Sequence, residues 1–178
     1  MYKNRNFHIG LVIVGFILDQ ITKLWAVAAF ATPDGSVTPA VYNVIGDLFR
    51  FRLAYNTGAA FSMQPQKIFP FLSPTVFYLA LSTVAIVAMI FFYKKLPTWD
   101  WGSKLGISLI LSGAFGNMFD RIRIDKVIDF IDWDFPDFII HRWPTFNLAD
   151  SWVCIGVVFV IFAPMLLNPE KKKQVDSE

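Results

Sequence analysis

The stretch VIDFIDWDFPDFIIHRWPTFNLAD, residues 127–150, lies between two segments that are apolar enough to cross a membrane. It contains five aspartates and no glutamate, and Ile, Phe and Trp flank the acids. A carboxylate between water and hydrocarbon is costly to ionise, and ionisable residues in such places usually have a function. The stretch therefore predicts a polar site at one surface of a membrane protein.

The composition also indicates a membrane protein. Of the 178 residues, 55% are hydrophobic and 17% are aromatic, which is too apolar for a soluble domain of this size. A helix needs about 20 apolar residues to cross roughly 30 Å of hydrocarbon. Four runs come close to this length, at 8–29, 70–92, 104–121 and 150–167. We therefore expect a single, mainly α-helical membrane domain over residues 1–178, with four transmembrane helices.

The first run has an alternative interpretation as a cleavable signal sequence. It has a basic start, a short apolar core and the small residues AVAAFA at 26–31. However, Asp19, Gln20 and Lys23 interrupt the core, and three further apolar runs follow. We interpret the run as a retained helix.

The basic residues predict the orientation in the membrane. They flank the apolar runs at Lys3 and Arg5, in the 93–103 connection and in the tail at 171–173. By the positive-inside rule these parts are cytoplasmic, and the segments 30–69 and 122–149 lie outside. The asymmetry is modest, because other basic residues fall on the outer side. We expect residues 168–178 to form a disordered cytoplasmic tail.

The first outer segment predicts a small extracytoplasmic β-sheet. In LFRFRLAYN, residues 48–56, apolar and polar or small side chains alternate, as they do in a strand with one apolar face. TPDGSVTP at 32–39 predicts turns before the strand, and Gly58 predicts a turn after it. We expect the sheet to rest on the membrane surface.

Several classes of function are excluded by what the sequence lacks. Cys154 is the single cysteine, so no intrachain disulfide or thiolate metal cluster can form. His8 and His141 do not form an HExxH motif. Basic residues are not interleaved with aromatic residues as in a nucleic-acid-binding module. We expect no metal, no cofactor and no nucleic acid partner.

Polar residues inside two of the predicted helices need an explanation. Asp19 and Lys23 are four residues apart, so they share a helix face and can neutralise each other. The pair either anchors the helix structurally or helps to shape a nearby site. In GAFGNMFDR, residues 113–121, Gly113 and Gly116 predict close approach of a neighbouring helix.

The same segment ends in a polar face formed by Asn117, Asp120 and Arg121. We interpret Asp120 as a structural partner of its neighbour Arg121. The guanidinium of Arg121 could instead hold a lipid carbonyl or phosphate.

Asp129 and Asp150 are the candidate reactive acids. Apolar residues enclose Asp129, so its pKa should be raised. Asp150 precedes an apolar run, so it could simply be the N-cap of the last helix. If the 122–149 segment folds back, however, the two acids can face each other. One would then keep its proton and polarise an amide carbonyl, while the other takes a proton from water.

The remaining polar residues of this region have simpler interpretations. Asn56, Asn117 and Asn147 are candidates to orient the two acids or a substrate. Asp132, Asp134 and Asp137 are interpreted as solvated loop acids.

Five motifs together resemble those of one known family, the lipoprotein signal peptidases, also called signal peptidase II. They are DQITKLW (19–25), YNTGAAFS (55–62), GNMFDR (116–121), VIDF (127–130) and FNLAD (146–150). The resemblance covers roughly residues 9–167. It implies a bacterial inner-membrane aspartyl endopeptidase that cuts prolipoproteins before a cysteine carrying a diacylglyceryl group, and that is inhibited by globomycin.

The resemblance also implies roles for individual residues. Asp129 and Asp150 would be the catalytic acids. The positions expected to line the substrate and inhibitor site are Asn56, Asn117, Arg121, Asn147 and Ala149. The positions expected to give structural support are Asp19, Lys23, Gly58 and Asp120. Membrane lipids and globomycin-type inhibitors are the other expected partners.

Three rival functions predict different properties. A proton-coupled transporter would use Asp19 and Asp120 as a relay, with polar residues spread through the depth of the bilayer. A lipid-binding scaffold would use Arg121 and the aromatic surface without catalysis. A serine intramembrane protease is disfavoured, because no GxSG-type nucleophile with a partner histidine is present.

Overall fold

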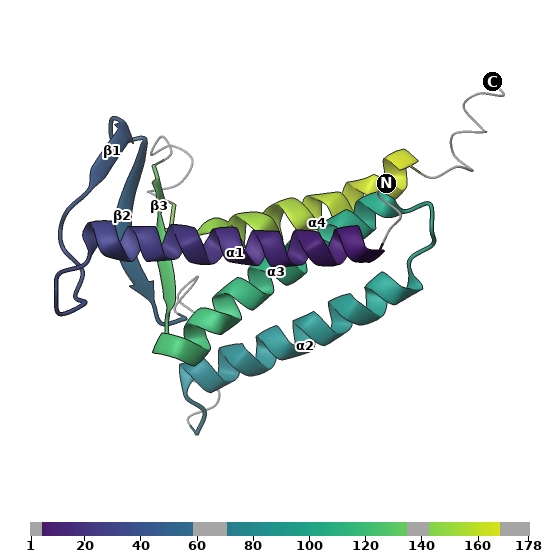
Figure 1. Cartoon of the computed structure of the whole chain (residues 1–178), viewed down its shortest axis with the longest axis horizontal. Coiled ribbons are helices and arrows are strands. Elements are labelled where there is room, and N and C mark those ends of the chain that lie inside the picture. Colours follow the sequence, from purple (N-terminus) through teal and green to yellow (C-terminus); the bar gives the residue numbers. More distant parts are fainter. Residues whose placement is uncertain (1–4, 59–70, 135–142, 168–178) are drawn as a thin grey trace.

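The computed structural model describes residues 5–58, 71–134 and 143–167. Its elements are α1 (Arg5–Phe30), β1 (Tyr42–Ile45), β2 (Phe49–Asn56), α2 (Pro74–Lys95), α3 (Trp101–Ile124), β3 (Val127–Trp133) and α4 (Leu148–Leu167). Figure 1 shows the three strands lying across one end of the helices, whereas α1 begins and α4 ends at the opposite end. The sheet therefore covers one end of a helical bundle.

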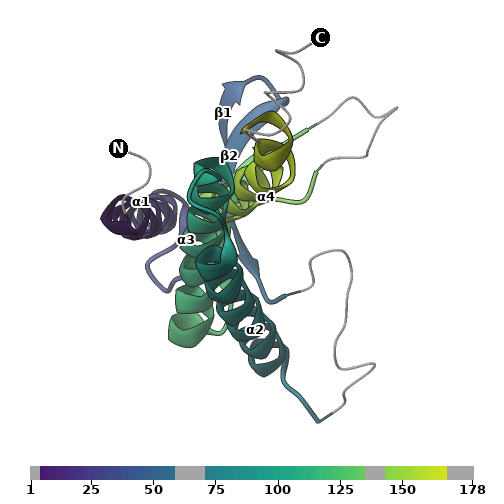
Figure 2. The same ribbon diagram turned by 90° about the vertical axis from the view of Figure 1, so that its right-hand side faces the viewer.

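Helix α3 lies at the centre of the bundle and packs against α1, α2 and α4 (Figure 2). Small residues allow this close packing. A side chain at Gly113 would meet the carbonyl oxygen of Ala149 on α4, and one at Gly116 would meet the carboxylate of Asp19 on α1. The prediction that Gly113 and Gly116 face a neighbouring helix is therefore confirmed.

Within the described residues, three helices are long and apolar enough to cross a membrane: α1, α2 and α4. Helix α3 is less apolar, because its buried face carries serines and the acid Asp120. A mainly helical, membrane-type fold with a small sheet is thus confirmed, whereas the fourth transmembrane span remains a prediction.

Local signals place the helix ends a few residues from the predicted bounds. Helix α2 begins at Pro74, where the Ser73 side chain caps the helix by accepting a hydrogen bond from the Val76 backbone N–H. Helix α3 begins after Asp100, which caps it in the same way. It ends at Ile124, because the next residue, the C-cap Asp125, has a left-handed φ of 59°.

The sheet has the order β1-β2-β3, and both pairings are antiparallel. The strand predicted at 48–56 is confirmed as β2. The sequence did not predict strand β1. It also did not predict strand β3 within the segment 122–149. The sequence of β3, VIDFIDW, lacks strict alternation of apolar and polar residues, because most of its residues on both faces are buried.

The sheet is attached to the end of α1 by a hydrophobic cluster. Ala26 and Phe30 of α1 pack against Leu53 of β2 and against Ile128 and Phe130 of β3. This packing buries one face of β3 and fixes the strand relative to the bundle. The position of Asp129, between Ile128 and Phe130, is fixed with it.

A β-bulge in β2 sets which side chains face the site. The register between β2 and β3 shifts by one residue midway along β2. In a regular strand, side chains an even number of residues apart lie on the same face, so Arg50 and Asn56 would share a face of β2. Their partners on β3, Asp132 and Asp129, are three residues apart and therefore lie on opposite faces. The extra residue allows Arg50 to pair with Asp132 while Asn56 reaches Asp129.

Candidate active site

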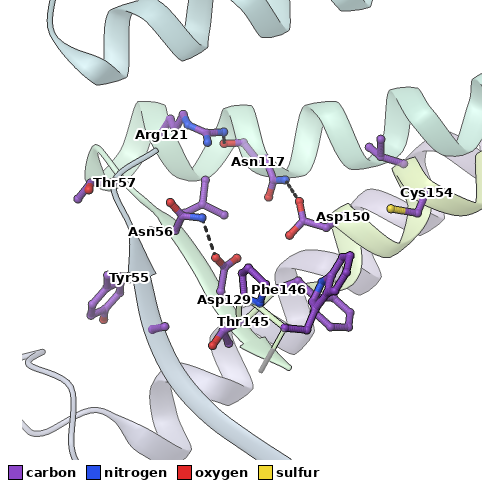
Figure 3. A pocket seen from close by; sticks show the side chains of 15 residues that line it. Tyr55, Asn56, Thr57, Asn117, Arg121, Asp129, Thr145, Phe146, Asp150 and Cys154 are labelled. Carbon is purple, nitrogen blue, oxygen red and sulfur yellow. Dashed lines mark hydrogen bonds between the residues drawn. The ribbon is translucent and has the colours of Figure 1, made fainter. Parts of the chain in front are cut away.

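A cavity of about 670 Å³ opens where α3 and α4 meet the sheet. Five of the predicted site residues line it, Asn56, Asn117, Arg121, Asp129 and Asp150 (Figure 3). Apolar side chains of β3 and α4 and the segment 143–146 complete the wall. The cavity therefore combines two acids with an apolar surface.

Asp129 is held by amide groups. Its side chain is 2% exposed, and its Oδ2 accepts a hydrogen bond from Asn56 Nδ2 at 3.0 Å, while its Oδ1 accepts one from Asn147 Nδ2 at 2.7 Å. Among the described residues, no cation lies within ion-pair distance of it. Burial, and next the charge of Asp150, raise the pKa of Asp129 to about 7. The sequence-based prediction of a raised pKa agrees with this environment.

Asp150 lies in the first turn of α4, but it is not the N-cap as one interpretation predicted. The helix begins at Leu148, so Asn147 is the cap. Asn147 Oδ1 accepts from the backbone N–H of Asp150 at 2.9 Å, and Asp150 Oδ2 accepts from the backbone N–H of Asn147 at 3.1 Å. This reciprocal pair is a capping box. Asp150 Oδ1 also accepts from Asn117 Nδ2 at 2.8 Å, as Figure 3 shows.

Asn147 connects the two acids. Its side-chain amide donates to Asp129, and its backbone N–H donates to Asp150. The structure therefore brings Asp129 and Asp150, which are 21 positions apart in the sequence, to one cavity wall. Two acids that share a site in this way do not both ionise easily, which is the condition for one acid and one base to act together.

A second group of acids lies next to the cavity and surrounds Lys23. Lys23 is fully buried, and its Nζ lies 2.9 Å from Asp19 Oδ2 and 2.9 Å from Asp120 Oδ2. The predicted Asp19–Lys23 pair is confirmed. The predicted partner of Asp120 was wrong: Asp120 pairs with Lys23, and with Arg123 at 3.7 Å. Neighbouring residues of a helix point in directions about 100° apart, which separates Asp120 from Arg121.

This group holds the backbone just before each candidate acid. Asp120 Oδ2 accepts from the backbone N–H of Ile128, and Asp19 Oδ1 accepts from that of Ala149. These residues immediately precede Asp129 and Asp150. The Lys23 cluster, formed by Asp19, Lys23 and Asp120, therefore contacts the backbone on which both candidate acids lie.

Lys23 Nζ also donates to Asn117 Oδ1 at 2.9 Å. The Asn117 amide nitrogen is thereby left to donate to Asp150. Gln20 was missed by the sequence analysis as a member of this network. It donates to Asp19 at 3.0 Å and to Asp120 at 3.3 Å, and the signal for it was a polar side chain inside an apolar run.

The other predicted positions differ in their relation to the cavity. Arg121 lines it, with its guanidinium 5.0 Å from the centre of the Tyr78 ring. Gly58 closes a turn by donating its backbone N–H to Asn56 Oδ1 at 2.8 Å. Ala149 is fully buried against α3, behind the cavity wall. Tyr78 was not predicted, because a tyrosine in an apolar run carries no local signal.

The interpretation of Asp132 as a solvated loop acid was wrong. It is fully buried on β3 and pairs with Arg50 Nε at 2.6 Å and Arg52 Nε at 3.1 Å. Asp134 is half-buried, and its backbone N–H donates to the Leu48 carbonyl. Asp137 and the predicted tail at 168–178 lie outside the described residues.

Comparisons with known proteins show the family of the chain. The family model described as signal peptidase (SPase) II matches residues 11–166. A lipoprotein signal peptidase of Nostoc punctiforme is 36% identical over 175 residues, which cover 98% of each chain. One of Clostridium tetani is 35% identical over 85% of this chain and 87% of its own. A bacterial membrane enzyme solved by the in meso method at 1.9 Å resolution superposes with a TM-score of 0.73 and 27% identity, covering 93% of this chain and 95% of that one. The chain therefore belongs to the signal peptidase II family.

Proposed function

We propose that this chain removes the signal peptide from prolipoproteins by hydrolysing the bond before a diacylglyceryl-modified cysteine, with Asp129 and Asp150 as the catalytic acids. The substrate class follows from the family and from relatives named lipoprotein signal peptidase. The observation that carries the mechanism is the pair of acids on one cavity wall, joined through Asn147.

The two acids have environments suited to different roles. Asp150 lies in the first turn of α4, where its two carboxylate oxygens accept from Asn117 Nδ2 and from the backbone N–H of Asn147. Asp129 is buried, and its pKa is raised to about 7 by burial and by the charge of Asp150. We therefore assign Asp150 as the general base and Asp129 as the general acid.

The reaction then proceeds through a tetrahedral intermediate. Asp150 removes a proton from water as the water oxygen attacks the scissile carbonyl carbon. Asp129 gives its proton to the carbonyl oxygen. When the C–N bond breaks, Asp150 returns its proton to the departing amine, and Asp129 regains one from the intermediate. The products are the signal peptide acid and the free amine of the cysteine.

The shape of the molecule suits such a substrate. The cavity lies at the sheet end of the bundle, and its wall includes Val153, Cys154 and Phe146 beside the acids. A signal helix could lie along the bundle with its scissile bond at the cavity. We propose that Asn56 and Arg121, which line the cavity, bind the substrate backbone and that globomycin-type inhibitors occupy the same cavity.

We place the chain in the bacterial inner membrane, with both termini cytoplasmic and the cavity at the outer face. Support comes from the three membrane-type helices and from the basic residues near the end of the bundle opposite the sheet.

The Lys23 cluster also weakens the alternative of a proton-coupled transporter. Asp19 and Asp120, the proton relay of that alternative, are both paired with one lysine.

The test is cleavage by the purified protein in detergent, followed by mass spectrometry of the products. The two substrates are one precursor peptide with and without the diacylglyceryl group on its cysteine. We expect a single cut before the modified cysteine and little or no cleavage of the unmodified peptide. Cleavage at another bond, or none, would refute the proposal.

A further inference from the structure

We propose that Tyr78 of α2 is a positioning residue for the reaction: its hydroxyl holds the turn that directs Asn56 at Asp129, and its ring holds Arg121 at the cavity. The inference rests on the proposed function and adds a residue that none of the five sequence motifs contains. Tyr78 is buried, with 8% of its surface exposed, although α2 packs mainly against α3 and carries only one other buried side chain, Ile86.

The hydroxyl acts through a chain of hydrogen bonds. Tyr78 donates its O–H to the carbonyl oxygen of Gly58. The backbone N–H of Gly58 donates to Asn56 Oδ1 at 2.8 Å, and Asn56 Nδ2 donates to Asp129 Oδ2 at 3.0 Å. Because the amide oxygen of Asn56 is occupied by the turn, its NH₂ group is the part that faces Asp129. Tyr78 thus lies three hydrogen bonds from the reacting carboxyl group.

The turn has a conformation that favours glycine. Gly58 has a φ of 101°, which side-chain-bearing residues rarely adopt. A Cβ at this position would also collide with the Tyr78 ring. The ring and the turn are therefore packed directly on each other, and the hydroxyl bond fixes the turn in the one position that serves Asn56.

The ring acts on a second member of the site. The Arg121 guanidinium lies 5.0 Å from the centre of the Tyr78 ring, a cation–π contact. Arg121 also donates from Nη1 to the backbone oxygen of Asn117 at 3.4 Å. One aromatic side chain therefore supports the two cavity residues that we expect to bind the substrate backbone.

The first turn of α2, which precedes Tyr78, is attached to the end of α3. Ser73 caps the helix, and Thr75 Oγ1 donates to the backbone oxygen of Asp125 at the end of α3 at 3.4 Å. Tyr78 lies one turn further along α2. The helix thus reaches the site through a first turn that is tied to α3.

Two substitutions separate the two contributions. Tyr78→Phe removes the hydroxyl and keeps the ring over Arg121, whereas Tyr78→Leu removes both. Tyr93→Phe is the matched control, since it removes a hydroxyl from the same helix far from the cavity. Each purified variant is assayed for kcat and KM on the diacylglyceryl-modified precursor peptide, and its thermal unfolding is followed in the same detergent.

We expect Tyr78→Phe to lower kcat about tenfold, because Asn56 acts on the acid, and to raise KM less than Tyr78→Leu does, because Arg121 is still in place. Tyr78→Leu should lower kcat at least as far and also raise KM. In an Asn56→Ala background, Tyr78→Phe should have almost no further effect on kcat, since both changes break one chain.

A second measurement does not depend on cleavage. The protonation of Asp129 is followed against pH by its carboxyl infrared band, identified by its loss in Asp129→Asn. The charged groups facing Asp129 are Asp150 on α4, Arg121 on α3 and Lys23 on α1. The Asn56 bond stabilises the ionised form, so weakening it in Tyr78→Phe should move the titration midpoint to higher pH.

The inference is overturned if Tyr78→Phe matches Tyr93→Phe in both measurements, or if its lower rate is accounted for by less folded protein. Persistence of the full effect in Asn56→Ala would also overturn it. If the wild type does not cut the precursor, the proposed function fails, and the infrared titration alone then decides the role of Tyr78.

Discussion

Two groups of buried acids lie side by side in this protein and have different partners. In the Lys23 cluster, Asp19 and Asp120 share a fully buried lysine at 2.9 Å each. At the cavity, Asp129 is bonded by the amides of Asn56 and Asn147, and Asp150 by an amide and a backbone N–H. Both groups are connected through Asn117, which accepts from Lys23 and donates to Asp150.

Under the proposed function, the difference separates acids for structure from acids for chemistry within one region. A lysine at ion-pair distance offsets the charge of a buried carboxylate, which suits an acid whose oxygens hold the neighbouring backbone in place. Amide groups satisfy the hydrogen bonding of an acid without neutralising its charge. Asp129 can therefore retain a proton near neutral pH, as a general acid must.

The largest expected effect tests the cavity acids. Asp129→Asn and Asp150→Asn should each lower the turnover of the modified precursor at least about 10³-fold, because each removes one of the two proton-transfer groups. Folding should be retained, since an asparagine can keep most of the hydrogen-bonding geometry. Turnover is measured by product mass spectrometry, and thermal unfolding is measured in parallel.

Asp47→Asn is the matched control for these variants. Asp47 lies in the turn between β1 and β2, with 81% of its side chain exposed, so Asp47→Asn should leave turnover unchanged. If Asp129→Asn or Asp150→Asn kept wild-type turnover, the assignment of the catalytic pair would be wrong.

The second prediction breaks the Lys23 cluster. Lys23→Met leaves Asp19 and Asp120 buried without their lysine, and removing one partner of a buried pair costs about 3 kcal/mol or more. We expect a large fall in the unfolding temperature, and loss of turnover because the backbone before Asp129 and Asp150 is released. Unfolding in detergent is followed by intrinsic tryptophan fluorescence.

A triple substitution sharpens this test. Asp19→Asn and Asp120→Asn together with Lys23→Met remove all three charges, so part of the lost stability should return. If Lys23→Met alone were as stable as the wild type, the cluster would not be the support that its geometry indicates.

The third prediction concerns pH. The pKa of Asp129 is raised to about 7, so its protonated form is the main one below pH 7 and is lost above it. Since the mechanism needs that proton, kcat/KM should fall about tenfold for each pH unit well above 7. Rates are measured between pH 5 and 9 with a precursor lacking titratable groups near the scissile bond. A profile that is flat from pH 7 to 9 would contradict the role of Asp129 as the acid.

The smallest expected effect concerns a third buried acid, Asp132, which has two arginine partners. Arg52 is 40% exposed at its side chain, so Arg52→Gln should cost less than about 1 kcal/mol while Arg50 still pairs with Asp132. Turnover should change less than about twofold. The unfolding temperature of Arg52→Gln is compared with that of Arg50→Gln. The ion pair of Arg50 with Asp132 is shorter and more buried, so Arg50→Gln should lower the unfolding temperature more.

Much of the fold could be predicted from local patterns. The four helices follow from long apolar runs, and β2 follows from alternation over 48–56. Strand β3 could not be predicted in this way, because it is buried on both faces and loses the alternating pattern. The β-bulge also has no local signal, although it decides that Asn56, and not its neighbour, reaches Asp129.

The candidate site was predicted in its residue types more fully than in its contacts. Asp129, Asp150 and the three asparagines stood out as polar residues among apolar ones. Their partners did not: Asp120 pairs with Lys23 and not with Arg121, Asp132 is buried, and Tyr78 reaches the site from a separate helix. These contacts join residues that are far apart in the chain.

The sequence by itself determined that the chain is a helical membrane protein with acids at one end, because hydropathy and charge are properties of each segment alone. Only the tertiary structure decided which acid has a cation and which has amides. That choice depends on the packing of α1 against α3 and on the register of β2 with β3, and our assignment of supporting and catalytic acids rests on it.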